Sequence, residues 1–105
     1  MKKLYSSGHY GFIEYDVMGE TEWHWSLRNP GGYIVSGDKC DLNIHYFFNK
    51  DEALQHRLKC LEWDIRNLQY NMKEWPNDHS FAAWKRDVEI YIKEAMKVRK
   101  LVENG

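Results

Sequence analysis

Apolar residues in the second half of the chain recur at alternating intervals of four and three, and this spacing is the strongest constraint on the fold. The series runs without interruption through Leu54, Leu58, Leu61, Ile65, Leu68, Met72 and Trp75. Such intervals place the apolar side chains on one stripe of a helix, as in the seam between two packed helices. They predict a helix over residues 49–75, with Asn49 as its N-cap and Glu52 completing a capping-box-like start.

A second series with helical spacing follows Pro76. It comprises Phe81, Trp84, Val88, Tyr91, Ala95, Val98 and Val102. Pro76 ends the first helix, and Asn77 or Asp78 is expected to cap a second helix over residues 78–104. Because the connection is so short, we expect the two helices to run antiparallel and to pack as a hairpin along their apolar stripes.

The first 48 residues have a different pattern, in which glycines separate short segments. Six of the 7 glycines lie at or before residue 37, and the last is residue 105. Between the glycines apolar and polar residues alternate, as is typical of half-buried strands. We predict strands over residues 11–18, 21–28, 33–36 and 41–48. The expected fold class is therefore α+β, a four-stranded antiparallel meander over residues 1–48 followed by the helical hairpin, and the 105 residues are expected to form a single domain.

The register of the first two strands can be predicted, because residues opposite each other in an antiparallel pair share a sheet face. A two-residue loop would place Val17 opposite Glu22, apolar against polar. A three-residue loop over residues 19–21 instead pairs Val17 with Trp23, Tyr15 with Trp25 and Ile13 with Leu27. The same register places Asp16 opposite His24 on the polar face.

This polar face holds the candidates for catalysis. His24 backed by the Asp16 carboxylate has the arrangement used in general acid-base catalysis, and His45 on the last strand is a third candidate. Histidines on separate strands have no recognisable metal-ligand spacing, so we expect no metal site. The sequence holds no phosphate-binding loop, nucleophile elbow or HExxH motif, and we therefore expect neither a cofactor nor enzymatic activity.

Aromatic residues make up 15% of the chain, more than a small core uses, so some rings are expected at the surface. Trp63 and Tyr70 lie two turns apart on the first helix, opposite its apolar stripe. The second helix has a similar surplus in Ile90, Ile92 and Leu101. This surplus predicts an apolar contact beyond the hairpin, either with the sheet or with another copy of the chain.

Nucleic acid is a less favoured partner. Three strands followed by a helix, with the turn Asn29–Gly32 and the helix entry Asn49–Ala53, resemble in topology the small arm-type DNA-binding domains of phage integrases over about residues 10–68. The resemblance implies DNA binding through the sheet. However, the net charge is -1, and Glu14, Asp16 and Glu22 lie where phosphates would need cations.

We therefore expect a small non-enzymatic interaction protein that self-associates through its helices and binds and blocks a partner protein, as phage and mobile-element counter-defence inhibitors do. One alternative is sequestration of a nucleotide-like molecule in a pocket lined by aromatic, Arg and Lys side chains, and another is an acid-base enzyme centred on His24. No apolar run is long enough to span a membrane and no signal-peptide core is present, so a cytoplasmic location is expected. The expected binding residues are Trp63, Tyr70, Phe47, Tyr33, Arg28, Lys39 and His24.

Overall fold

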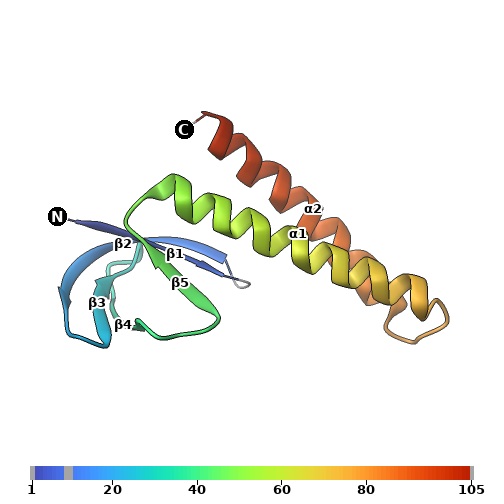
Figure 1. Cartoon of the computed structure of the whole chain (residues 1–105), viewed down its shortest axis with the longest axis horizontal. Coiled ribbons are helices and arrows are strands. Elements are labelled where there is room, and N and C mark those ends of the chain that lie inside the picture. The colour runs from blue at the N-terminus through green and yellow to red at the C-terminus, as the bar shows by residue number, and fades with distance from the viewer. Residues whose placement is uncertain (1, 9–10, 105) are drawn as a thin grey trace. The chain divides into compact units, whose positions relative to one another are not determined.

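The computed structural model describes residues 2–8 and 11–104 and contains an antiparallel sheet and a helical hairpin (Figure 1). The α+β class is thus confirmed. The chain divides into two compact units, one up to Arg57 and one from Leu58 onwards, with the boundary inside the first helix. The elements are β1 (Lys3–Gly8), β2 (Gly11–Glu20), β3 (His24–Arg28), β4 (Ile34–Asp38), β5 (Ile44–Phe47), α1 (Lys50–Glu74) and α2 (Phe81–Asn104).

The sheet has five strands in the order β4-β3-β2-β1-β5, so the prediction of four strands is wrong. The missing strand is β1, which pairs antiparallel with both β2 and β5. Both faces of this strand are covered, since Leu4 and Ser7, which point to opposite faces, are 1% and 0% exposed. A strand that is buried on both faces needs no alternation of apolar and polar residues, and the segment from Leu4 to Ser7 has none.

The last strand also lies elsewhere than the predicted meander places it. β5 pairs with β1, at the opposite edge of the sheet from β4, with Tyr46 across from Ser6. The strand begins at Ile44 rather than Asp41 because the preceding residues form a turn. In this turn the Asp41 carboxylate accepts a hydrogen bond of 2.8 Å from the backbone N–H of Asn43.

The predicted register between β2 and β3 is wrong as well. β2 continues through Gly19 to Glu20, and an irregularity between Val17 and Gly19 shifts the pairing, so that Val17 lies opposite Leu27. The loop therefore covers residues 21–23, and the Thr21 N–H donates to the carbonyl oxygen of His24 over 2.8 Å. Gly19 belongs to a bulge within a strand and not to the turn, which is a common place for glycine in sheets.

The sheet is curled, so that side chains from its two edge strands, β4 and β5, meet on its concave face. A Cβ atom added to Gly37 on β4 would lie 2.5 Å from the Tyr46 hydroxyl oxygen of β5 and 3.4 Å from a methyl carbon of Leu27. Trp25 also meets Phe48 edge-on, with 5.7 Å between ring centroids. Desolvation on this face raises the pKa of Tyr46. Gly37 is thus required for the close approach of Tyr46.

The opposite face of the sheet carries the first two turns of α1, within the first unit. The Asn49 side-chain oxygen accepts a hydrogen bond of 3.1 Å from the Glu52 N–H, which confirms the predicted N-cap. The Ser7 hydroxyl lies 2.9 Å from Nδ1 of His56, and Arg57 donates to the carbonyl oxygen of Gly8. These contacts attach the start of the helix to β1.

The hairpin of the second unit follows the predicted apolar stripes. Leu61 of α1 and Val88, Ala95 and Val98 of α2 are buried. α2 begins at Phe81 rather than at residue 78, because the N–H of Trp84 donates to the carbonyl oxygen of Ser80. Ser80 is therefore the N-cap. In the described part of the chain, neither helix is apolar enough over a sufficient length to cross a bilayer.

Candidate partner-binding surface

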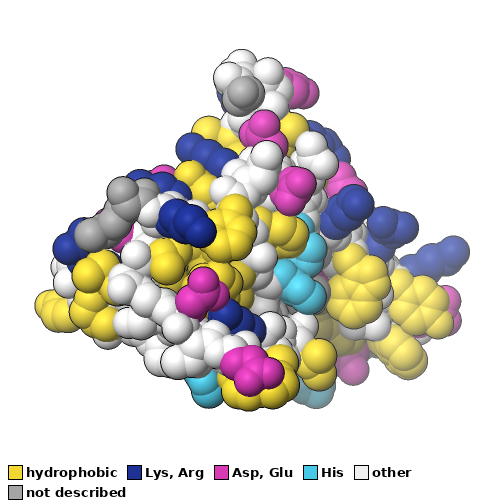
Figure 2. All heavy atoms as spheres, turned by 60° about the vertical axis from the view of Figure 1, so that its left-hand side comes forward, with side chains coloured by type: hydrophobic (Ala, Val, Ile, Leu, Met, Phe, Trp, Pro, Cys, Tyr) yellow, Lys and Arg dark blue, Asp and Glu magenta, His cyan; other side chains and the backbone are white. Residues whose placement is uncertain are grey.

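The second unit exposes many large apolar side chains on its two helices and directly after α1. Each is between 41% and 59% exposed. On the face of the molecule in Figure 2, hydrophobic side chains are interleaved with charged ones. Isolated apolar residues are normal on protein surfaces, but a concentration on two adjacent helices is typical of an interface. The residues are Trp63, Tyr70, Trp75, Ile90, Ile92, Met96 and Leu101.

The outer face of α1 combines aromatic rings with cations. Trp63 and Tyr70 are seven residues apart, which places them on the same side of the helix, opposite the buried stripe. Lys59, Arg66 and Lys73 recur at the same interval beside them. Sequence analysis identified the two rings but not the three cations, although their seven-residue interval is a signal that could have revealed them.

A groove runs between α1 and α2 in the second unit. It encloses about 310 Å³, and its apolar part is formed by Ile65, Ile92, Ala95 and Met96. Its charged lining residues are Glu62, Arg66 and Arg99. Arg99 of α2 donates from Nη2 to Oε1 of Glu62 on α1 over 3.1 Å, which joins the two helices. The groove can therefore accept apolar side chains that have polar or charged neighbours.

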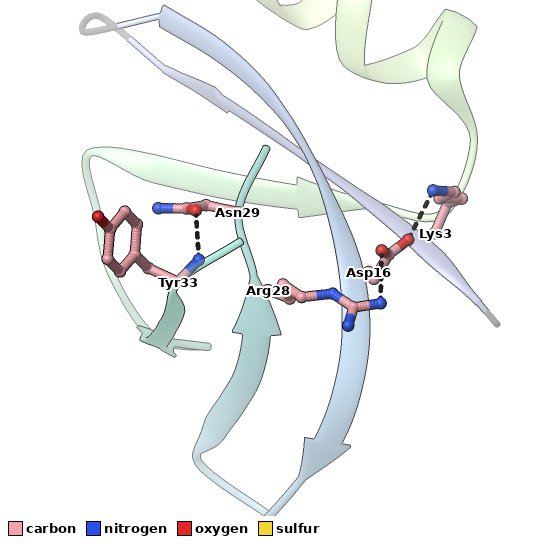
Figure 3. A network of polar contacts seen from close by, with 5 residues as sticks. All are labelled: Lys3, Asp16, Arg28, Asn29 and Tyr33. Carbon is pink, nitrogen blue, oxygen red and sulfur yellow. Dashed lines mark hydrogen bonds and ion pairs between the residues drawn. The ribbon is translucent and has the colours of Figure 1, made fainter. Parts of the chain in front are cut away.

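On the sheet, the structure separates the predicted acid-base pair. Asp16 lies opposite Arg28 and not opposite His24, which instead faces Asp38. The Asp16 carboxylate accepts hydrogen bonds of 2.6 Å from Lys3 and 3.2 Å from Arg28 (Figure 3). The hydrogen bonds from Lys3 and then Arg28 hold the pKa of Asp16 below its ordinary value. Asp16 thus pairs with two cations. The prediction that its carboxylate supports His24 is wrong.

His45 lies beside a second histidine. Its ring centroid is 4.7 Å from that of His56 on α1, and Phe47 lies 5.3 Å from the same ring. The contact between the Ser7 hydroxyl and His56 resembles a nucleophile-base pair, yet Ser7 is 0% exposed, so no substrate can reach it. These residues form a structural contact between α1 and the sheet. Among the described residues, no group of three or more His, Cys, Asp or Glu is placed to hold a metal ion.

Lys39 is held by two neighbours. Its ammonium group lies 4.3 Å from the centroid of the Trp25 ring and 2.6 Å from a carboxylate oxygen of Glu20. The first contact is a cation-π interaction. The hydrogen bond from Lys39 lowers the pKa of Glu20. Lys39 therefore stabilises the sheet and already has partners of its own.

Of the other predicted binding residues on the sheet, His24 lies near Lys39, but Arg28 does not. Arg28 and His24 lie at opposite ends of β3, and Lys39 follows the end of β4 that pairs with His24. Tyr33 lies in the turn after Arg28, where its backbone N–H donates to the Asn29 side chain over 3.0 Å and its side chain is 74% exposed (Figure 3). At about 3.3 Å per residue, the two ends of β3 are roughly 13 Å apart. The structure thus does not bring Arg28 and Lys39 to one pocket.

The chain was compared with known protein families, with characterised proteins and with solved structures, and none of the three comparisons finds a match. The choice of a functional surface therefore depends on the residues themselves. Exposed large apolar side chains occur in both units, but most of those in the second unit lie along two helices, beside the groove between them, so the helical hairpin is the candidate surface.

Proposed function

We propose that the protein is a non-enzymatic interaction protein that binds and blocks a partner protein through the helical hairpin of its second unit. The observation that carries this proposal is the set of seven large apolar side chains exposed on α1, on α2 and at Trp75 directly after α1. Each of these side chains is already about half buried, so covering its exposed part contributes on the order of 1 kcal/mol. A partner that covers several of them gains several kcal/mol toward the entropic cost of association.

The outer face of α1 has the residue types that dominate binding energy in protein interfaces. Trp, Tyr and Arg are enriched among the residues whose truncation costs most. Trp63, Arg66 and Tyr70 occupy successive turns of this face, and Trp63 and Tyr70 are 56% and 59% exposed. Aromatic side chains lose little conformational entropy when they are covered, which makes them effective contacts.

The experiment is a pull-down from cell lysate with the wild-type chain and with Trp63→Ala. The proposal expects a protein that is retained by the wild type and lost from the variant. Leu42→Ala is the matched control, since Leu42 is 89% exposed but lies in a loop of the first unit. Equal retention of the same proteins by wild type and by a Trp63→Ala/Tyr70→Ala double variant would reject the proposal.

We also propose that the chain self-associates through a different side of the hairpin. Pairing two copies through the outer face of α1 would bring Lys59, Arg66 and Lys73 of both copies together, which is unfavourable. On α2, Ile90 and Leu101 share one side, and both are 51% exposed. In an antiparallel pairing of α2 with its copy, Ile90 lies opposite Leu101 and Glu94 opposite Lys97. This side is therefore self-complementary in both apolarity and charge.

A further inference from the structure

The groove of the second unit is suited to a particular kind of helix. We infer that the groove between α1 and α2 binds an acidic amphipathic helix of the partner protein. The inference rests on the proposed function, because it specifies which segment of the partner is recognised. The groove encloses about 310 Å³, at the lower end of the range for ligand sites.

The apolar part of the groove has the form that receives a helix. Ile92 and Met96 lie one turn apart on α2 and are 41% and 57% exposed, and Ile65 faces them from α1. Ala95 lines the groove between them, and its small side chain allows the backbone of another element to approach. A helix with apolar residues at intervals of three and four inserts side chains into such a groove and converts the hairpin into a three-helix bundle. Met96 can adapt to side chains of different shape.

The charged residues of the groove select an acidic partner. Arg66 stands on the α1 side and Arg99 on the α2 side, and among the described lining residues Glu62 is the acidic one. Glu62 is bound to Arg99 at 3.1 Å, and the two side chains are 37% and 55% exposed, so this pair rearranges at little cost. A guanidinium group has five N–H donors and binds carboxylates through two of them at once. Carboxylates flanking the apolar stripe of an incoming helix would therefore meet both arginines.

The basic character extends beyond the groove along α1. Lys59 and Lys73 precede and follow Arg66 by seven residues each, which is about two turns of helix. A helix lying in the groove would thus meet a row of cations on its α1 side. Nucleic acid is also attracted by such a row, but the groove is lined by aliphatic side chains rather than by the aromatic rings on which bases stack. The combination favours an acidic helix.

The test is fluorescence anisotropy with the full chain and a labelled designed peptide of about 20 residues, with Leu at helical intervals of three and four and Glu on both flanks. We expect the acidic peptide to bind at least about tenfold more tightly than the same peptide with Lys in place of Glu. The Arg66→Glu/Arg99→Glu variant should bind the acidic peptide about tenfold or more weakly than the wild type does. It should also bind the Lys peptide, which the wild type binds weakly. Arg86→Glu/Lys93→Glu, the same charge change on the outer side of α2, should leave both affinities unchanged.

Several results would overturn the inference. These are no binding of the acidic peptide, equal affinity for the acidic and basic peptides, or an unchanged affinity in Arg66→Glu/Arg99→Glu. If a single-stranded oligonucleotide competes with the peptide and depends on the same two arginines, the ligand of the groove is nucleic acid and not a helix. Gain of the Lys peptide by the double variant shows that the variant is folded. If the lysate partner is lost from Trp63→Ala but kept by Arg66→Glu/Arg99→Glu, the groove is rejected while the proposed function stands.

Discussion

Arg57 of α1 donates a hydrogen bond of 2.6 Å from Nη1 to the carbonyl oxygen of Gly8 at the end of β1. Arg57 is 3% exposed, and a hydrogen bond from a charged donor contributes about 1.5–3 kcal/mol. Arg57→Ala should therefore lower the free energy of opening of β1 by about 2–3 kcal/mol, measured by hydrogen exchange. Lys59→Ala, an exposed change nearby on the helix, should leave it unchanged. Equal protection of β1 in the two variants would contradict the assigned role of Arg57.

Asp16 gives the sheet a defined dependence on pH. Its pKa is held below the ordinary value of 3.8 by Lys3 and Arg28. A depressed carboxyl pKa means that its stabilising contribution is fully present above pH 3.8 and is lost as the pH falls through the folded-state pKa. Asp16→Asn should thus lower the melting temperature at neutral pH, and its melting temperature should approach that of the wild type in acid.

Melting curves of both proteins between about pH 2 and 7 test this prediction. Glu22→Gln is the control, because it removes the same charge from the exposed loop before β3. A difference between wild type and Asp16→Asn that stays constant over the whole range would show that the Lys3 and Arg28 contacts do not stabilise the fold.

Two glycines of the sheet should respond differently to the same substitution. A Cβ at Gly8 would collide with the backbone carbonyl oxygen of Asn43, whereas a Cβ at Gly19 meets nothing within 4 Å. Gly8→Ala should therefore lower the free energy of unfolding by more than about 2 kcal/mol, since backbone must move, and Gly19→Ala should change it by less than about 0.5 kcal/mol. Chemical denaturation measures both. A tolerated Gly8→Ala would show that the loop before β5 lies farther from β1.

The proposed pairing of α2 with its copy predicts a charge-swap pattern. Glu94→Lys and Lys97→Glu should each weaken self-association, because like charges then oppose each other, and the double variant should restore it. Sedimentation equilibrium of the four proteins measures the effect, and circular dichroism checks their helicity. A wild-type chain that stays monomeric at high micromolar concentration would reject the pairing.

The helices could be predicted from sequence because their signals are local. The intervals of four and three in α1 and the Asn49 cap each involve residues within two turns of one another. The position of Trp63 and Tyr70 opposite the apolar stripe could be predicted for the same reason. The groove could not be identified, because it depends on which flanks of α1 and α2 face each other, and this follows from the packing of the two helices.

The sheet was predicted less well because strand pairing and burial depend on residues that are distant in sequence. Gly19 suggests a turn, but it lies at a bulge, and moving the loop to residues 21–23 changes every partner of β3. Asp16 therefore meets Arg28 instead of His24, and the predicted catalytic pair disappears. β1 was missed because its burial depends on β5 and α1, which are distant in sequence.

The position of β1 between β2 and the edge strand β5 also determines when the sheet can be completed during synthesis. β1 leaves the ribosome first, and β2 follows at once, but its other neighbour, β5, emerges only after β3 and β4. At about 5–20 residues per second, the growing chain spends several seconds with one edge of β1 open. An open edge can pair with another nascent chain. The nascent chain is thus protected from pairing with other chains at this edge once β5 and the first turns of α1 have emerged.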